Sequence, residues 1–280
     1  HRSGTSALTG LMKILGFNVG YNLLIGNKFF NKKWPCQKKI NSFCISINKF
    51  FNNKIKKLIE KEINSKKKSD KIFYSKLSNF VITFSFYLNK YLLNRNKLLK
   101  KGHFEPRDII HINDLILLSI DSWWGDIRPL PEDWEKQKQM KIYKDKIKKI
   151  IYLNYGKKGN FCIKEPRISI LLPLYLEVFK EMNIEPNLIF IKRNKDEIIK
   201  SLMARNDFKE ERCTLITEKY LESIEKYIKP YNYVEINYSD LINKPEESIL
   251  KIKKLNIPMK DYNLVKKDVQ KFIDPKLKHH

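Results

Sequence analysis

Helical periodicity alternates with short apolar runs through the C-terminal part of this 280-residue chain. Residues 188–191 form a continuous apolar run after Pro186, and residues 233–236 form a second one. Runs of this length, bounded by turn residues, are typical of buried strands. Each run precedes a segment with helix-start signals, and strand, turn and helix in succession predict a parallel sheet flanked by helices. The pattern therefore indicates an α/β fold.

Local signals place several element boundaries. Asn194 suits the N-cap of the helix after the first run, with Glu197 three residues later at the capping-box position. Pro245 begins another helix, because proline is favoured in the first helical turn. Residues 7–16 present a helix-like apolar face that ends in a glycine. Residues 161–163 are predicted to form one more short strand.

The segment 27–100 differs from the rest of the chain in charge. It holds 19 Lys or Arg and 3 Asp or Glu, a net +16 of the whole chain's +25. Residues 55–63 and 80–93 have the spacing of amphipathic helices, and the lysine run 66–68 between them is expected to be a solvated loop. We therefore predict a basic, mainly helical insertion in the α/β fold.

Composition narrows the classes of function. A net charge of +25 favours a nucleic-acid or polyanion partner, but only eight of the 56 basic residues are arginine and most of the excess lies in one segment. No run of eighteen apolar residues occurs, so no membrane span is expected. The four cysteines lack CxxC spacing, which favours free thiols in a reducing compartment and no metal site.

A loop that can bind phosphate opens the chain. Small and hydroxyl residues follow one arginine directly ahead of the first predicted helix: Arg2, Ser3, Gly4, Thr5 and Ser6. Such a loop gathers backbone N–H groups, hydroxyls and the positive end of the helix dipole around one point. The alternative is a capped helix start without a ligand. The lysine of the GxxxxGK[ST] phosphate loop is missing, which disfavours a kinase-like phosphotransferase.

A second anion site is predicted at the end of the first apolar run. Arg193 follows that strand, and Ser201 lies eight residues later, about two turns along the next helix. Ligands of open α/β sheets usually bind outside the carboxyl ends of the strands, where both side chains can converge. Two anion sites at one sheet edge imply a bis-phosphorylated ligand.

These features together resemble the nucleotide-binding motifs of sulfotransferases that use 3′-phosphoadenosine 5′-phosphosulfate (PAPS). Five further segments stand in the order of that family: Lys101-Gly102-His103-Phe104-Glu105, Ile112-Asn113-Asp114, Ser122-Trp123-Trp124, Lys164-Glu165-Pro166-Arg167 and Asn237-Tyr238-Ser239-Asp240-Leu241. The resemblance covers the first 20 residues and most of 101–255. It looks closest to the microbial and Golgi-like branch, whose members modify carbohydrate or protein hydroxyls.

The resemblance implies one domain over residues 1–280 with a P-loop-like parallel sheet, and 27–100 as an insertion within it. In the family a central strand precedes the phosphosulfate loop, so we expect a strand ahead of the printed chain. The implied cofactor is PAPS, with no metal. Arg2 to Ser6 would hold the 5′-phosphosulfate, and Arg193 with Ser201 would hold the 3′-phosphate.

The resemblance also suggests the catalytic base. Golgi-type relatives use a glutamate at this place, which corresponds to Glu105, and the adjacent Phe104 can desolvate its carboxylate. His103 is the rival, because a histidine is the base in the cytosolic branch of the family. A third possibility is that neither residue is the base.

Two cations follow the short strand predicted over residues 161–163. Lys164 is expected to contact the transferring sulfonate or the acceptor as a catalytic group, and Arg167 to contact the acceptor. The alternative is a structural network between Glu165 and Arg167, since charges at strand ends often only satisfy loops.

Other polar and aromatic residues are candidates for binding the acceptor. Asn113 and Asp114 can hydrogen-bond a sugar, or they can be a polar pair internal to a helix. Trp124, with Trp123 and Trp134, can stack on a pyranose ring, although packing in the core or at its rim is the usual role of tryptophan.

The sequence therefore predicts sulfuryl transfer from PAPS to an acceptor hydroxyl, expected to belong to a carbohydrate. Two alternatives stay open: a basic polyanion- or nucleic-acid-binding protein, and a P-loop kinase-like phosphotransferase. We expect a small nucleotide donor and a hydroxyl acceptor as partners, without nucleic acid. A cytoplasmic location is expected, or the Golgi lumen if a signal anchor precedes the printed residues.

Overall fold

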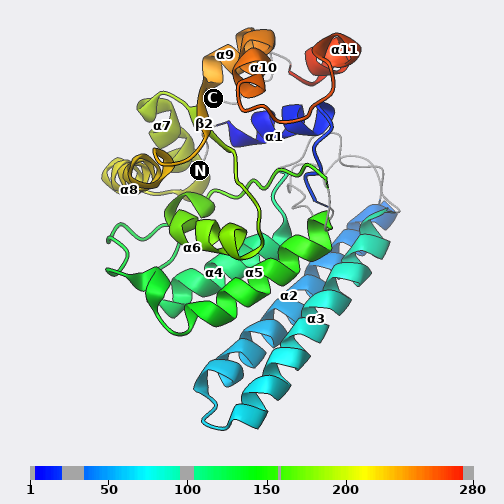
Figure 1. Ribbon diagram of the computed structural model, residues 1–280, viewed down its shortest axis with the longest axis vertical. Helices are drawn as coiled ribbons and strands as arrows, with labels where there is room; N and C mark the ends of the chain where they lie inside the picture. The colour runs from blue at the N-terminus through cyan, green and yellow to red at the C-terminus, as the bar shows by residue number, and fades with distance from the viewer. Residues whose placement is uncertain (1–3, 21–34, 95–103, 157–158, 274–280) are drawn as a thin grey trace.

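The computed structural model describes residues 4–20, 35–94, 104–156 and 159–273; at 35–48 and 89–94 it describes the backbone alone. These ranges are mostly helical, around a small sheet (Figure 1). The elements, in chain order, are α1 (Thr5–Ile14), α2 (Pro35–Asn64), α3 (Lys68–Asn94), α4 (Arg107–Ser119), the 3₁₀ helix η2 (Trp134–Lys136), α5 (Met140–Tyr155), α6 (Ile168–Glu181), β1 (Leu188–Lys192), α7 (Lys195–Asn206), α8 (Glu210–Ile228), β2 (Tyr233–Asn237), α9 (Tyr238–Asn243), α10 (Pro245–Lys253) and α11 (Tyr262–Phe272).

The two predicted strands pair in parallel, as the sequence pattern indicated. Leu188 of β1 lies opposite Tyr233 of β2, and Lys192 lies opposite Asn237. The chain crosses from β1 to β2 through α7 and α8, which is the strand–helix–strand order that parallel pairing requires. The fold is therefore broadly α/β, with a sheet of two strands in the described part of the chain.

The prediction of a strand over residues 161–163 is wrong. Asn18 and Phe161 form only an isolated parallel bridge, through the hydrogen bonds Asn18 N–H to Asn160 O and Cys162 N–H to Asn18 O. A strand needs a partner along its length, and the segment around Asn18 pairs with it at one point. Residues 161–163 therefore form an extended segment that leads to Lys164.

The predicted helix boundaries of the α/β part are confirmed. Asn194 caps α7, because its side-chain oxygen accepts hydrogen bonds from the N–H groups of Asp196 at 2.8 Å and Glu197 at 3.3 Å. Pro245 occupies the first turn of α10. Gly16 ends α1 with a φ of +101°, and its N–H donates to Lys13 O at 3.1 Å, as at many helix C-termini.

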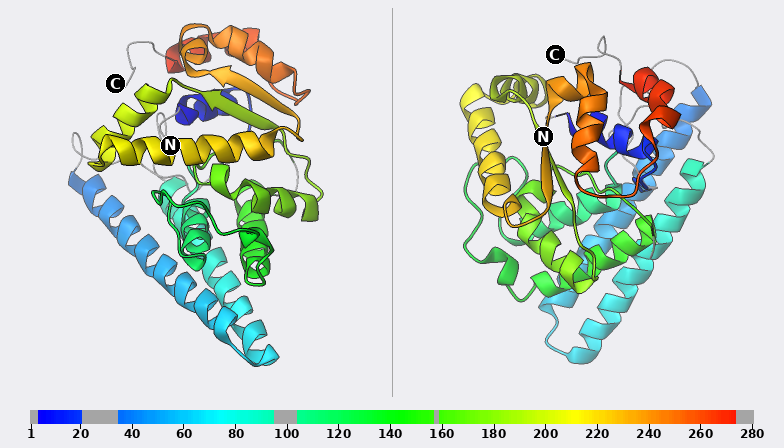
Figure 2. Two further views of the ribbon diagram at one scale, coloured as in Figure 1. Left: turned by 90° about the vertical axis from the view of Figure 1, so that its left-hand side faces the viewer. Right: turned by 45° about the horizontal axis from the view of Figure 1, so that its top comes forward.

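The described part of the basic segment 27–100 is a helical hairpin of α2 and α3, which projects from the rest of the molecule (Figures 1 and 2). The two predicted helical stretches both lie within it. Lys66 and Lys67 are exposed in the turn, and α3 begins at Lys68. None of the described helices combines the length and the hydropathy that crossing a bilayer requires.

The described residues form two larger apolar cores and two small ones. One of the larger cores joins the hairpin to α4, α5, α6 and α8, with Ile59, Ile116 and Ile147 almost fully buried. The other larger core lies between α1, the strands and helices α9 to α11, with Leu11 and Ile236 fully buried. The candidate site lies where α1, the end of β1 and the segment before α6 approach one another.

Polar contacts also attach the hairpin to its core. Lys146 Nζ of α5 lies 3.1 Å from Glu62 Oε2 of α2, with side chains 1% and 8% exposed. His111 Nε2 of α4 lies 3.1 Å from the Asn52 carbonyl oxygen. Burial lowers the pKa of His111 to about 4, against the opposing effect of the bond to Asn52.

Candidate active site

The opening loop enters α1 through a position that requires glycine. Gly4 has a φ of +94°, and an added Cβ would lie 2.1 Å from Cδ2 of Tyr238. Both the left-handed backbone and the close approach exclude a side chain here. Glycine also has no side chain with which to cap the first-turn N–H groups of α1, and none is capped in that way. Arg2 and Ser3 lie outside the described residues.

Tyr238 brings the two predicted anion-binding elements together. The guanidinium carbon of Arg193 lies 4.7 Å from the centre of the Tyr238 ring, the same ring that contacts Gly4. Arg193 Nε also donates to Glu197 Oε2 at 2.6 Å. Ser201 lies on α7, as predicted, and is 2% exposed. The end of β1 therefore meets the start of α1 across one aromatic ring.

Lys164 joins the predicted catalytic residues to the loop. Its ammonium group pairs with Oε1 of Glu105 and donates to the Ser6 hydroxyl at 3.3 Å. The side chains of Lys164 and Glu105 are 8% and 14% exposed. Burial lowers the pKa of Lys164, although the charge of Glu105 opposes that shift. Three residues from three separate segments thus share one polar cluster, which lies at the N-terminus of α1.

The backbone beside Glu105 is strained. Phe104 has a φ of +52°, a left-handed conformation that bulky side chains rarely adopt. Its ring is 3% exposed and packs against Val19 and Phe272. This conformation sends the aromatic ring into a small core and leaves Glu105 to meet Lys164. His103, the rival base, lies outside the described residues.

A buried network fixes the segment that carries Lys164. Glu165 accepts a hydrogen bond from Asn113 Nδ2 at 2.6 Å and pairs with the Arg167 guanidinium. Tyr175 OH donates to Asn113 Oδ1 at 2.7 Å. Arg167 Nε lies 2.7 Å from Asp114 Oδ1. Burial raises the pKa of Glu165, and Arg167 and Asn113 oppose that shift.

This network changes the interpretation of three acceptor candidates. Asn113 is 0% exposed and both ends of its amide have protein partners, so it positions Glu165 and is not open to an acceptor. Arg167 pairs with Glu165, which is the structural role that the sequence left open as its alternative. Asp114 keeps a side chain that is 40% exposed, and it can still reach a ligand.

Aromatic rings and arginines gather on the surface beside this cluster. Trp124 stacks on Phe208, with ring centres 5.9 Å apart, and meets Trp123 edge-on at 5.3 Å. The guanidinium carbon of Arg205 lies 5.3 Å from the Trp124 ring centre, and that of Arg212 lies 5.1 Å from the Trp123 ring centre. We call these five residues the aromatic platform. The charge of Arg205 also contributes to the lowered pKa of Lys164.

Sequence reasoning found only the two tryptophans of the platform. Phe208, Arg205 and Arg212 lie at the end of α7 and the start of α8, more than 80 residues later, and no local pattern connects them to the tryptophans. Trp134, the third predicted tryptophan, is 4% exposed and belongs to the larger core. Trp134 therefore packs in the core, which was the alternative to stacking on a sugar.

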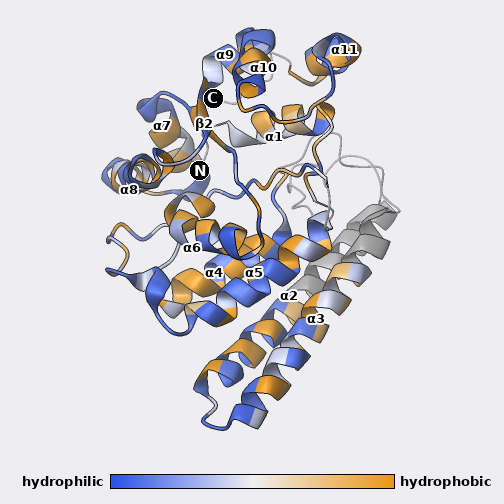
Figure 3. Cartoon of the chain, in the orientation of Figure 1, coloured by the Kyte–Doolittle hydropathy of each residue, from blue (hydrophilic) through white to orange (hydrophobic). Residues whose placement is uncertain are grey.

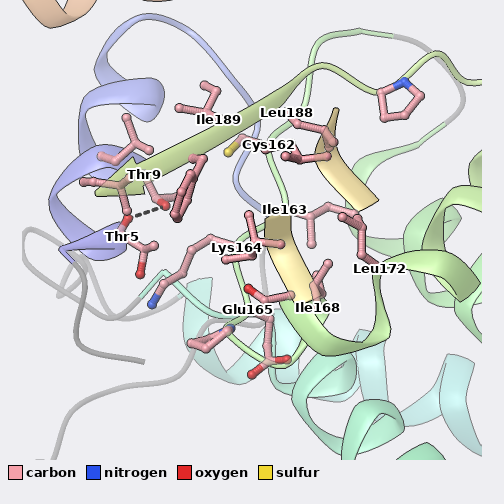
Figure 4. Close-up of a pocket in the computed structure, with 18 of the residues that line it drawn as sticks. Thr5, Thr9, Cys162, Ile163, Lys164, Glu165, Ile168, Leu172, Leu188 and Ile189 are labelled. Atoms are coloured by element: carbon pink, nitrogen blue, oxygen red, sulfur yellow. Dashed lines mark hydrogen bonds between the residues drawn. The ribbon is translucent and has the colours of Figure 1, made fainter. Parts of the chain in front are cut away.

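A cavity of about 620 Å³ is lined by some of the predicted site residues (Figure 4). Thr5, Lys164 and Arg193 contribute to its lining, and the side chains of β1 line much of the remainder. Within the described ranges β1 pairs with β2 alone. The cavity therefore has a polar part near α1 and an apolar part along β1. The further strand that the resemblance implies stays a prediction.

Among the described residues no group of three or more His, Cys, Asp or Glu side chains could hold a metal ion. Cys162 and Cys213 are free thiols, and burial raises the pKa of Cys162 to about 12, so this thiol is not a nucleophile at neutral pH. Comparisons of the chain with protein-family models, with curated proteins and with solved structures found no match. A function is therefore argued from the site itself.

Proposed function

We propose that the protein is a PAPS-dependent sulfotransferase with a P-loop-like arrangement of β1, β2 and α1. The observation that carries this proposal is the pairing of Lys164 with both Glu105 and Ser6. A candidate base and a cation lie beside the N-terminus of the helix that would hold the phosphosulfate. Group transfer between a bound anion and a hydroxyl needs these parts in one place.

The donor would occupy the sheet edge. Backbone N–H groups in the first turn of α1, with Arg2 and Ser3, would hold the 5′-phosphosulfate at the positive end of the helix dipole. Arg193, at the other side of Tyr238, would hold the 3′-phosphate. The two groups are neighbours across one ring, which suits the two anionic ends of a bis-phosphorylated nucleoside.

In the proposed transfer step, Glu105 and Lys164 have different roles. The acceptor oxygen attacks sulfur, the bond between sulfur and the leaving phosphate oxygen breaks, and Glu105 takes the acceptor proton. The Lys164 ammonium stabilises the charge that develops on the leaving phosphate oxygen, as cations do in phosphoryl transfer. Burial of both side chains strengthens these electrostatic contributions.

The aromatic platform favours a carbohydrate acceptor. Trp123 is 38% exposed, so part of its ring can stack on the apolar face of a sugar. Arg205 and Arg212 can donate hydrogen bonds to sugar hydroxyls or to anionic substituents. In this proposal the acceptor extends from the platform to Glu105, which takes the proton of its hydroxyl.

Calorimetry with 3′-phosphoadenosine 5′-phosphate, the product nucleotide, tests this function. We expect Arg193→Ala to weaken binding by about tenfold or more, because a charge-assisted contact to phosphate is lost. Lys192→Ala is the matched control: it removes the same charge from the adjacent position, where Lys192 pairs with Glu235. Wild-type protein that fails to bind the nucleotide at low salt would refute the proposal.

The two alternatives predict other outcomes in the same experiments. A kinase-like enzyme would bind ATP with Mg²⁺ more tightly than the bisphosphate and would transfer phosphate only with the metal. A polyanion binder would lose affinity steeply with salt and would tolerate Arg193→Ala.

A further inference from the structure

The helical hairpin carries an exposed aromatic surface that the proposed function does not use. Phe50 of α2 is 65% exposed. On α3, Phe73, Phe80, Phe84 and Tyr87 are 59%, 65%, 49% and 57% exposed. The α3 residues are spaced at helical intervals, so they lie along one side of that helix. We call these five residues the aromatic face.

Three residues of the aromatic face are joined across the two helices, through the half-buried Phe51. Phe50 meets Phe51 with ring centres 5.5 Å apart, and Phe51 meets Phe84 at 5.6 Å. Phe84 then stacks on Phe80 at 6.3 Å. Contiguous exposed apolar surface of this kind marks an interaction site on a soluble protein, whereas single exposed apolar residues do not.

The opposite side of α3 is buried, and it is apolar apart from Ser78 and Ser85. Val81, Ile82 and Phe86 are buried, and Val81 and Ile82 belong to the core that joins the hairpin to α4 and α5. From residue 71 to residue 88, the exposed side chains of α3 are Ile72, the four aromatic residues of the face and Lys76. A helix that is apolar on both sides normally has both sides covered, so the aromatic face lacks a covering surface.

The other helix of the hairpin supplies positive charge beside this face. The exposed charged side chains of α2 between residues 49 and 61 are five lysines and one acid: Lys49, Lys54, Lys56, Lys57, Lys61 and Glu60. The acid lies 3.9 Å from Lys56. Long lysine side chains can keep their ammonium groups in water while apolar neighbours are buried. Aromatic rings beside lysines are the composition of helices that lie at a membrane surface.

We propose that the aromatic face of the hairpin binds the surface of a membrane that contains anionic lipids. The rings would enter the headgroup region, and the α2 lysines would contact the lipid phosphates and carboxylates. Charge complementarity selects this occupant, because the 27–100 segment carries a net +16 and would repel a second copy of itself. The face lies on the helical hairpin, which projects from the rest of the molecule (Figure 3).

Co-sedimentation of the full chain with vesicles tests the proposal. We expect binding to vesicles of phosphatidylcholine with phosphatidylserine, and weak binding to phosphatidylcholine alone. The double substitution Phe80→Ser with Phe84→Ser should weaken binding by about tenfold or more. Leu250→Ser with Leu264→Ser is the matched control, because these leucines are 55% and 83% exposed but lie on α10 and α11.

A charge variant keeps the test decisive if the serine variant does not fold. Lys54→Glu with Lys57→Glu changes two exposed side chains, and it should abolish the preference for anionic vesicles while circular dichroism stays unchanged. The proposal is overturned if wild-type protein does not bind anionic vesicles. It is also overturned if the Phe80/Phe84 and Lys54/Lys57 double variants both bind them as wild type does. It is also overturned if light scattering shows a dimer that Phe80→Ser with Phe84→Ser converts to a monomer.

Discussion

Two buried lysine–glutamate pairs occupy different regions of this protein. Lys146 and Glu62 lie between the hairpin and α5, with side chains 1% and 8% exposed. Lys164 and Glu105 lie beside the start of α1, with side chains 8% and 14% exposed. The first pair is enclosed by the core, whereas Lys164 of the second also lines the cavity. Similar chemistry thus serves attachment in one region and, in our proposal, catalysis in the other.

The surroundings of each lysine explain the difference. Lys146 Nζ lies 3.4 Å from the Ser75 hydroxyl and from Asn79 Oδ1, in addition to its ion pair. All these partners belong to the hairpin, so the ammonium group holds α2 and α3 against α5. Burial lowers the pKa of both lysines, and the paired glutamate opposes the shift in each case. A lowered pKa by itself therefore does not identify a functional lysine.

Removing one partner of the enclosed pair should have the largest effect on stability. Glu62→Ala leaves Lys146 charged in the core, and we expect a loss of about 3–5 kcal/mol in the free energy of unfolding. Urea denaturation measures this loss. The double variant Glu62→Leu with Lys146→Met removes both charges and should recover most of the stability. A single variant as stable as wild type would contradict the comparison.

The corresponding change at the other pair should act on turnover. Glu105→Gln removes the proposed base but keeps the side-chain shape, so sulfuryl transfer should slow by about 10²–10⁴-fold. Its effect on unfolding should be smaller than that of Glu62→Ala, because the Glu105 side chain is 14% exposed and that of Glu62 is 8% exposed. Turnover with PAPS and affinity for the product nucleotide are measured together. Slow turnover with unchanged nucleotide affinity is the expected result, and unchanged turnover would exclude Glu105 as the base.

Acid should weaken the attachment of the hairpin through His111. The folded pKa of about 4 lies below the ordinary value near 6.5, so the unfolded chain binds the extra proton between these values. This contribution to stability is complete above pH 6.5 and is lost as pH falls toward 4. We expect a loss of about 2 kcal/mol between pH 7 and pH 5. His111→Gln, unfolded in urea at both pH values, should show a smaller loss.

Gly4 offers a smaller test at the active-site end. Gly4→Ala forces a left-handed alanine against Tyr238, and we expect a cost of about 1–3 kcal/mol and weaker nucleotide binding. Gly156→Ala is the matched control, since Gly156 has a φ of +79° and nothing lies within 4 Å of its added Cβ. Thermal unfolding compares the two variants. Equal costs would show that the Tyr238 contact does not constrain the loop.

Local patterns predicted much of the fold but few of its long-range contacts. The two strands, the Asn194 cap and the Gly16 helix end follow from neighbouring residues, and all three are confirmed. The strand over residues 161–163 was predicted wrongly, because its apolar composition does not reveal whether a partner strand is present. The hairpin helices extend beyond their predicted stretches, since α2 and α3 depend on packing against each other as well as on periodicity.

In the candidate site, too, local patterns predicted some residues and missed those that depend on long-range contacts. Arg193 and Lys164 were predicted from their places at the ends of apolar runs, and the structure brings both to one cavity. Asn113 was assigned to an acceptor because a sequence does not show that an amide is enclosed and satisfied. Arg205 had no signal in the sequence, since its partner Trp124 is distant in the chain.

The Tyr238 ring between Gly4 and Arg193 has a consequence for ligand choice. Both residues contact one flat side chain, so in our proposal that ring helps to set the distance between the two anion-binding groups. The site would thus select nucleotides by the distance between their two anionic groups. Exchange of the ring for a smaller residue would change which molecules fit, even with every charged residue left in place.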